Sequence, residues 1–251
     1  MIWSEPGEGG EWARVQVLED HKHDIFAVCF SPNGKQLATG SVDKLINLYT
    51  FNEGSAILAH TLEGHTKFVY SLSFSPDCEL LCSGSWDKSI KFWNPVDGSL
   101  VKSVDGAHSN NIRCVVYSPN GRVVASGAED KSIKIWDAST FELKHTFDAL
   151  HTGGVEDLSF TPDSNFLVSG SVDKTVRLTK VAYFTQATNL LEGLKEEDPI
   201  MVKEAILTLI KLDSLLLKVF FKKLLVDQMF QEATMLLRAV WKLMREVSER
   251  L

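Results

Sequence analysis

The 251-residue chain has little cysteine, and its cysteines form no pattern typical of a disulfide framework or a zinc site. There are four of them, and none has the C-x-x-C spacing found in zinc sites and redox motifs. The first twelve residues, MIWSEPGEGGEW, have no apolar core of the kind a secretory signal requires. Without a signal or paired cysteines, we expect an intracellular protein, cytoplasmic or nuclear.

The sequence also lacks the motifs of the common enzyme classes. It contains no nucleophile elbow, no glycine-rich phosphate loop and no zinc-binding spacing. We therefore predict a protein that is not an enzyme, with no catalytic residues, no metal and no cofactor.

An excess of positive charge is absent as well. The formal net charge is −7, and it falls in the first 184 residues, because residues 185–251 hold ten basic and ten acidic side chains. An acidic main region does not favour nucleic-acid binding. The apolar stretches near the C-terminus are interrupted by charges such as Lys211, Asp213 and Lys218, which are costly in lipid, so a membrane span is disfavoured.

A histidine–aspartate pair recurs four times with the same separation. Each aspartate follows its histidine by 22 residues, and successive pairs are 43 or 44 residues apart. A period of this length indicates a repeat architecture. The pairs are His21/Asp43, His65/Asp87, His108/Asp130 and His151/Asp173, within the frames GSVDKLINLY, GSWDKSIKFW, GAEDKSIKIW and GSVDKTVRLT.

Each repeat contains runs with strand character separated by turn residues. In the second unit, residues 68–74 alternate apolar with small or polar side chains, and a Ser-Pro-Asp turn follows. Two further runs, residues 80–85 and 89–93, flank the turn that holds Asp87, and a more polar run covers 99–104. Four strands in a unit of this length are typical of a propeller blade.

These motifs resemble the WD40 family of β-propeller proteins, over roughly residues 12–183. The resemblance implies a mainly β fold, with a WD40 region at 12–184 and a short α-helical segment after it. It also implies that residues 12–18 supply the missing fourth strand of the last blade, and we expect residues 1–11 to be a flexible N-terminus. The implied blades lie near 21–61, 65–104, 108–147 and 151–183.

The resemblance implies a structural hydrogen-bond network in every blade. In the family the aspartate accepts hydrogen bonds from the histidine and the turn backbone, and a Ser or Thr links the histidine to a Trp. A buried carboxylate requires such partners. The Trp position holds Tyr49 in the first unit and Thr179 in the fourth, so we expect the fourth blade to be the loosest. The other implied members are His21, Thr39 and Asp43; His65, Ser83, Asp87 and Trp93; His108, Ser126, Asp130 and Trp136; and His151, Ser169 and Asp173.

The number of blades leaves three interpretations open. The chain supplies strands for four blades, whereas most WD40 propellers have seven. The chain forms an arc that pairs with another arc, such as a copy of itself, or it is a product of a longer gene, or the C-terminal segment covers the open edge. Exposed sheet edges promote aggregation, so a bare four-blade arc is the least expected state.

The composition changes after residue 184. Asp198-Pro199 is a helix start signal, and apolar residues then recur at helical spacing up to about residue 226 and again over 232–250. Residues 185–251 are therefore predicted to form a helical tail. Because a helical module of this length is marginal alone, we expect it to pack on the propeller edge or on another copy. Its lysine-bearing amphipathic character leaves a membrane surface as a less favoured alternative.

The expected function is a non-catalytic protein–protein interaction scaffold that binds peptides or partner proteins. Two alternatives remain: a substrate-adaptor subunit of a ubiquitin ligase, and an assembly factor that oligomerises through its helical tail. Val96 and Ser139 stand where cullin-linked adaptors usually have an arginine, and this difference makes the adaptor alternative less favoured.

The family resemblance also implies a partner-binding face around the pore. Tyr70 and Trp86 are predicted to form an aromatic clamp for a peptide with one basic anchor, the alternative being that Trp86 only packs on the neighbouring blade. Two further positions before the turn aspartates, Val42 and Val172, belong to the same face. The candidate binding residues are Phe26, Tyr70, Trp86, Arg113, Glu129 and Glu156.

Overall fold

The computed structural model describes residues 2–3, 14–52 and 55–181. Within them the prediction of a mainly β fold is confirmed, because the elements are strands gathered into successive antiparallel sheets. The predicted helical tail, residues 185–251, lies outside the described residues, and so does most of the predicted N-terminal segment. The part of the chain that the structure describes holds no helix that could cross a membrane.

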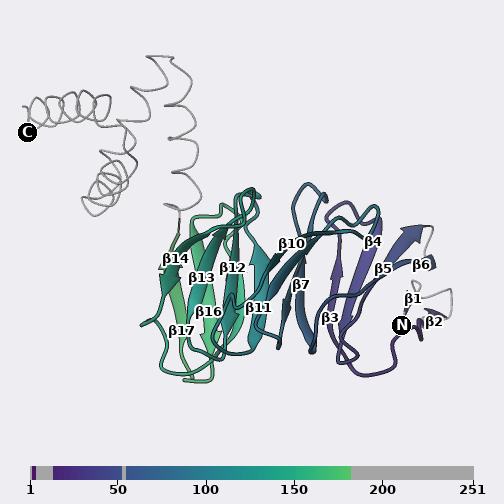
Figure 1. Ribbon diagram of the computed structural model, residues 1–251. Helices are drawn as coiled ribbons and strands as arrows, with labels where there is room; N and C mark the ends of the chain where they lie inside the picture. The colour runs from purple at the N-terminus through teal and green to yellow at the C-terminus, as the bar shows by residue number, and fades with distance from the viewer. Residues whose placement is uncertain (1, 4–13, 53–54, 182–251) are drawn as a thin grey trace, which may run out of the picture. The chain divides into compact units, whose positions relative to one another are not determined.

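Four of the sheets are simple meanders in which each strand pairs with the next along the chain (Figure 1). The first consists of β3 (Ile25–Phe30), β4 (Gln36–Ser41), β5 (Ile46–Asn52) and β6 (Ser55–Leu62). The second consists of β7 (Val69–Phe74), β8 (Leu81–Ser85), β9 (Ile90–Trp93) and β10 (Leu100–Val104). The third consists of β11 (Ile112–Tyr117), β12 (Val123–Ala128), β13 (Ile133–Asp137) and β14 (Leu143–Phe147). The fourth has three described strands, β15 (Val155–Phe160), β16 (Phe166–Ser171) and β17 (Val176–Lys180).

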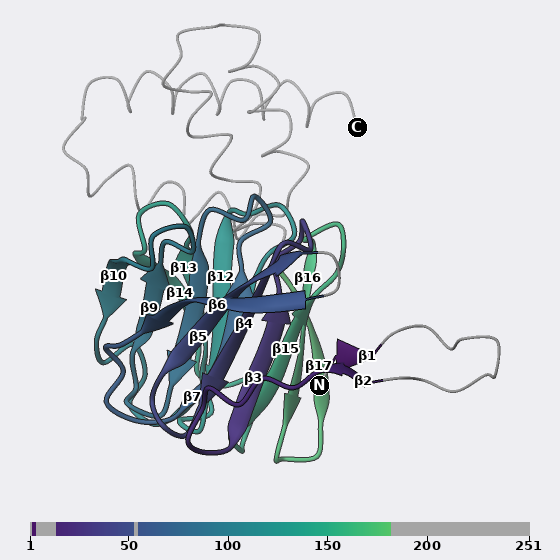
Figure 2. The ribbon, with the colours of Figure 1, turned by 90° about the vertical axis from the view of Figure 1, so that its right-hand side faces the viewer.

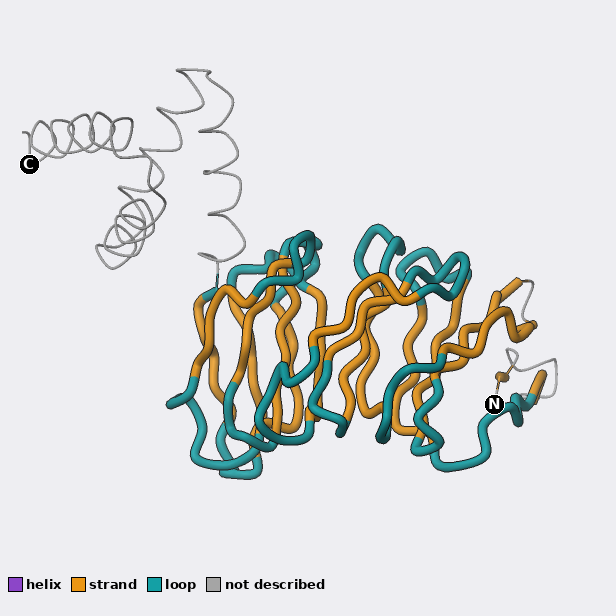
Figure 3. Tube along the Cα trace, in the orientation of Figure 1, coloured by secondary structure: helices purple, strands orange, loops and turns teal. Residues whose placement is uncertain are grey.

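Turn chemistry explains where the strands begin and end. After the first strand of a sheet, Ser31 donates its hydroxyl proton to Asn33, and Gly34 takes a positive φ of 70° that closes the turn. After the second strand, the residue following each turn aspartate is a lysine in the left-handed region, with φ between 68° and 76°. That conformation is uncommon outside glycine and marks a tight turn. Figure 3 shows these loops gathered at the two ends of the strands.

Consecutive sheets pack face to face through buried apolar side chains. The first strands lie against one another in order, β3 on β7, β7 on β11 and β11 on β15. Between the first and second sheets, Ile46 and Leu48 meet Val69, and each is at most 1% exposed. Two similar cores lie between the later sheets. The described sheets therefore form a row of repeated units, held together mainly by apolar burial (Figure 1). Figure 2 looks along this row, with the first sheet toward the viewer.

The N-terminal strand occupies a different place from the one that the resemblance implies. β2 (Arg14–Gln16) pairs with β1 (Ile2–Trp3), and the Gln16 side-chain amide bonds to both the N–H and the C=O of Ala56 in β6 at 2.8 Å. The fourth sheet has three strands among the described residues. The physical reason is distance: within one chain two whole sheets separate β3, which directly follows this segment, from β17.

Candidate functional site

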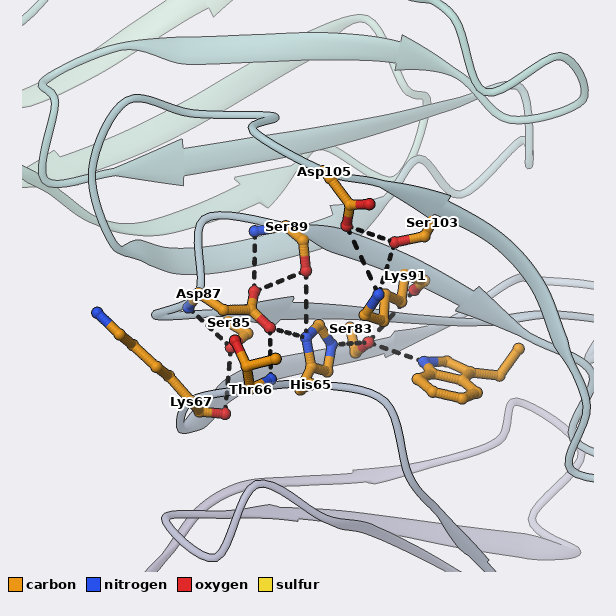
Figure 4. A network of polar contacts seen from close by, with 11 residues as sticks. His65, Thr66, Lys67, Ser83, Ser85, Asp87, Ser89, Lys91, Ser103 and Asp105 are labelled. Carbon is orange, nitrogen blue, oxygen red and sulfur yellow. Dashed lines mark hydrogen bonds and ion pairs between the residues drawn. The ribbon is translucent and has the colours of Figure 1, made fainter.

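The histidine–aspartate pairs form hydrogen-bond networks inside the sheets, and Figure 4 shows the second one. His65 Nδ1 lies 2.8 Å from an Asp87 carboxylate oxygen, and His65 Nε2 lies 2.8 Å from Ser83 Oγ. Trp93 Nε1 donates to the same hydroxyl at 2.8 Å. An ionised carboxylate only accepts, so the proton lies on Nδ1 and Nε2 accepts the serine proton. Each polar atom of this buried chain thus has a partner.

The other three repeats contain the same arrangement. His21, His108 and His151 each contact their aspartate through Nδ1 at 2.9 to 3.0 Å, and a Thr or Ser hydroxyl through Nε2 at 2.7 Å. Trp136 donates to Ser126 at 2.8 Å. In the first repeat a tyrosine replaces the tryptophan, and the Tyr49 hydroxyl donates to Asp20 at 3.1 Å. Burial and the Asp20 carboxylate raise the pKa of Tyr49 to about 12.

The turn aspartates are stabilised in their ionised form. Burial raises the pKa of Asp87, but hydrogen bonds from His65, Ser89 and Thr66 lower it by more, and the pKa lies far below its usual range. The pKa of Asp130 is lowered in the same way by His108 and Ser132. A carboxylate held this firmly is a poor proton acceptor at neutral pH.

The histidine and aspartate side chains of these networks are all hydrogen-bonded to one another or to their neighbours. In each repeat both ring nitrogens of the histidine are engaged, so neither is open to a substrate. The described residues also contain no group of three or more His, Cys, Asp or Glu side chains that could hold a metal ion. The networks serve to hold the second and third strands and the preceding loop of each sheet together.

An aromatic cluster lies across the first two sheets, at the ends of the strands near the turn aspartates. The Phe26 ring from β3 stacks on Tyr70 from β7, with centroids 4.9 Å apart and planes at 25°. Tyr70 in turn stacks on Trp86, with centroids 5.9 Å apart and planes at 18°. Phe68, just before β7, lies 5.0 Å from Trp86. Four rings from the first two sheets therefore contact one another in series, in the order Phe26, Tyr70, Trp86 and Phe68.

Arg113 from β11 completes this cluster and connects it to the third sheet. Its guanidinium carbon lies 4.9 Å from the centroid of Tyr70 and 5.0 Å from that of Trp86, within the range of cation–π contacts. Its Nε donates to Glu129 at 3.0 Å, and Glu156 lies 3.9 Å away. Burial lowers the pKa of Arg113, but Glu129 and Glu156 raise it by more, so the group remains charged.

We refer to Phe26, Phe68, Tyr70, Trp86, Arg113 and Glu129 as the aromatic–arginine cluster. The structure brings together five of the six candidate residues and places Glu156 at its margin. Phe68 was not predicted, although it is an aromatic residue three positions after a network histidine. The geometry also changes the clamp: the Tyr70 and Trp86 rings contact each other, and the guanidinium that contacts both is the chain's own.

The cluster has one buried hydrogen-bond donor without a partner, and two exposed side chains lie in it or at its margin. The indole Nε1 of Trp86 is covered and has no hydrogen-bond partner among the described residues. A buried donor left unpaired costs about 1–3 kcal/mol. In contrast, the Phe26 ring is 47% exposed, and the Glu156 side chain is 41% exposed. Phe26 and Glu156 are therefore the most exposed of these side chains.

Comparison with known proteins gives one finding of similarity. The family model described as "WD domain, G-beta repeat" matches residues 12–50, 57–94, 98–137 and 141–179, which together make up more than half of the chain. Three of the four matched units begin with the outer strand of one sheet and end with the third strand of the next, as for β6 to β9, and the first begins at β2. A search of the curated proteins found no match.

Proposed function

Because the chain belongs to the WD40 repeat family, whose repeats generally mediate protein–protein interactions, we propose that it is a non-catalytic scaffold that binds a short peptide segment of a partner protein at the aromatic–arginine cluster. One observation carries the proposal. Side chains from three different sheets converge there, and they are of the kinds that dominate binding hot spots, aromatic residues and arginine.

The charges around the cluster favour a partner segment with one basic group next to an apolar one. Arg113 is already paired with Glu129, whereas Glu156 lies 3.9 Å from the guanidinium and keeps much of its side chain in solvent. A basic partner group would pair with Glu156, and an apolar or aromatic group would cover the exposed ring of Phe26. This preference agrees with the acidic charge of the repeat region.

The test is recovery of partners from a cell extract with the purified full chain, identified by mass spectrometry. Phe26→Ala removes an exposed ring, and Tyr70→Ala removes the ring it stacks on. The matched control is Leu143→Ala, which removes an exposed apolar side chain from the outer strand β14. All variants are used only if their melting curves agree with that of the wild type.

We expect the partners recovered by the wild type and by Leu143→Ala to be lost or strongly reduced with Phe26→Ala and Tyr70→Ala. Loss of an aromatic hot spot weakens binding by about 2 kcal/mol or more, which is about thirtyfold or more in Kd. If all four proteins recover the same partners in the same amounts, the binding surface lies elsewhere on the chain.

A further inference from the structure

The two ends of the row of sheets expose faces that are buried at every internal junction. Each internal junction joins the face of one sheet to the first strand and neighbouring strands of the next. At the beginning of the row, Ile25, Val28 and Phe30 form what we call the first-sheet face. At the end of the row, Val168, Gly170, Val176 and Leu178 form the fourth-sheet face. A comparison with the residues at the same repeat positions in the other sheets shows what packs on such a face at an internal junction.

The first-sheet face matches side chains that are buried elsewhere. Ile25 is 45% exposed, whereas the residues at the same repeat position, Val69, Ile112 and Val155, are all 0% exposed. Val28 is 64% and Phe30 is 52% exposed, whereas their counterparts in the other three sheets are all at most 9% exposed. Leu37 and Tyr49 of the same sheet pack with Ala56 and Leu18. The first-sheet face thus has the apolar residues that form a junction in the other sheets, but among the described residues no sheet packs against it.

The fourth-sheet face shows the opposite half of the same junction. Val176 is 75% exposed, whereas Ile46, Ile90 and Ile133 at that repeat position are 0% exposed. Leu178 is 64% exposed, and its counterparts in the other sheets are at most 1% exposed. The third strand of this sheet, β17, keeps Val176 and Leu178 at positions that are buried in the other sheets, but it is mostly exposed.

A repeated glycine shows how closely the next sheet must approach. A Cβ on Gly40 would lie 2.7 Å from Val69, and one on Gly127 would lie 2.6 Å from Val155. Gly84 meets Ile112 in the same way. A Cβ on Gly170, at the same position in the fourth sheet, has nothing within 4 Å. Gly170 therefore leaves room for a β-branched side chain that the described residues do not supply, and Ile25 is the residue of that type at the matching position.

The polar groups match as well. At the second junction the backbone N–H of Tyr117 donates to Ser73 at 3.1 Å, and the N–H of Val115 donates to Ser71 at 3.0 Å. The position of Ser73 is held in the fourth sheet by Ser159, and that of Tyr117 is held in the first sheet by Phe30. The two end faces thus supply both halves of a junction, acceptor as well as donor.

We propose that the fourth-sheet face of one chain binds the first-sheet face of a second copy, and that two such contacts close a ring of eight sheets. Propellers contain roughly 4–8 blades, and the described residues of one chain form four blade-like sheets, so two copies reach a size within this range. The contact is head to tail, and with two copies it closes, which leaves neither face exposed. This assembly is independent of peptide binding at the aromatic–arginine cluster.

The test is a cysteine cross-link in the full chain. At the internal junctions the Cβ built on Gly40 lies 3.2 Å from the Cβ of Val69, and that on Gly127 lies 3.1 Å from the Cβ of Val155. Disulfides join Cβ atoms about 3.5–4.5 Å apart, so a small adjustment allows one here. We therefore place cysteines at the matching positions, Gly170→Cys and Ile25→Cys, in one chain, with each single variant as a control.

We expect the double variant to run as a covalent dimer on a non-reducing gel after mild oxidation, and each single variant to remain unlinked. An equal mixture of the two single variants should also form a cross-linked dimer. An intramolecular disulfide in the double variant, detected by mass spectrometry in an unlinked chain, would mean that one chain closes on itself and would overturn the proposal. No disulfide at all would show that something else covers the faces, such as another part of the same chain, and would also overturn it.

A second measurement uses light scattering to determine the solution mass of the otherwise unmodified full chain. We expect a dimer for the wild type and monomers for Val28→Asp and for Leu178→Asp. Mixing these two variants should restore a dimer, because each still has the face that the other lost. The control Ile57→Asp, which places the same charge at a 70% exposed strand position away from both faces, should remain a dimer. A monomeric wild type, or a mixture that stays monomeric, contradicts the head-to-tail contact.

Discussion

The network around Asp87 allows a quantitative prediction for a single substitution. Its carboxylate accepts hydrogen bonds from His65 Nδ1 at 2.8 Å, from the Ser89 backbone N–H at 2.9 Å and from the Ser89 hydroxyl at 2.6 Å. The backbone N–H of Thr66 donates to it as well, at 2.9 Å. Asp87→Ala removes the acceptor from all of these donors at once, and the His65 and Ser89 side chains are buried.

The magnitude follows from the donors left behind. A buried donor without a partner costs about 1–3 kcal/mol, and His65 and Ser89 supply three of them. A water entering the space left by the carboxylate would offset part of this cost. We therefore expect a loss of about 3 kcal/mol in the free energy of unfolding, as for other buried networks. For a chain of this size that corresponds to a Tm lowered by roughly 6–12 °C.

Thermal unfolding followed by circular dichroism measures the effect, with Asp97→Ala as the matched control. Asp97 also accepts from the backbone N–H and the hydroxyl of a serine two residues on, at 2.9 and 2.7 Å, but it is fully exposed. Its loss should leave the Tm within experimental error of the wild type. If Asp87→Ala melts together with Asp97→Ala, the buried network does not stabilise the sheet, and the reasoning is refuted.

Three further predictions follow from the same contacts. Trp93→Phe leaves the Ser83 hydroxyl without its indole donor at 2.8 Å and should lower stability in urea unfolding by about 1–2 kcal/mol, whereas an unchanged midpoint would contradict the role of the indole. The pKa values of Asp87 and Asp130 are lowered in the folded protein, so the stability they contribute is present above their unfolded pKa near 4 and is lost as the pH falls below it; the urea midpoint should drop below about pH 4, and less so in Asp87→Asn. Gly127→Ala places a Cβ 2.6 Å from Val155 and 2.7 Å from Cys114, so it should destabilise the chain by about 1–3 kcal/mol, and a Tm equal to the wild type would show that the junction can yield.

The strands and the networks could be predicted from the sequence because their causes are local and repeated. The turn residues around Ser31 and Gly34 and the alternation of apolar residues act within a few positions. The 22-residue separation of His65 and Asp87 then relates two loops of one meander. Because the pattern recurs four times, each repeat gives separate evidence for the same strands and the same network.

The arrangement of the candidate site depended on packing between repeats, which no local pattern encodes. Residue positions alone indicated Tyr70 and Trp86 on one face. They could not indicate that Arg113 from the next sheet lies 4.9 Å from Tyr70 and fills the expected peptide position. The place of β2 could not be predicted for a related reason, because it depends on the pairing with β1 and on the side-chain contact of Gln16 with Ala56 in β6.

The most direct test of the central claim, that a partner binds at the aromatic–arginine cluster, is an affinity measured by calorimetry. The ligand is a peptide selected from a random library against the immobilised full chain. We predict that Phe26→Ala weakens its Kd about thirtyfold or more, that Glu156→Gln weakens it if the peptide carries a basic residue, and that Leu143→Ala leaves it unchanged. An affinity for Phe26→Ala and Tyr70→Ala equal to that of the wild type would contradict the claim.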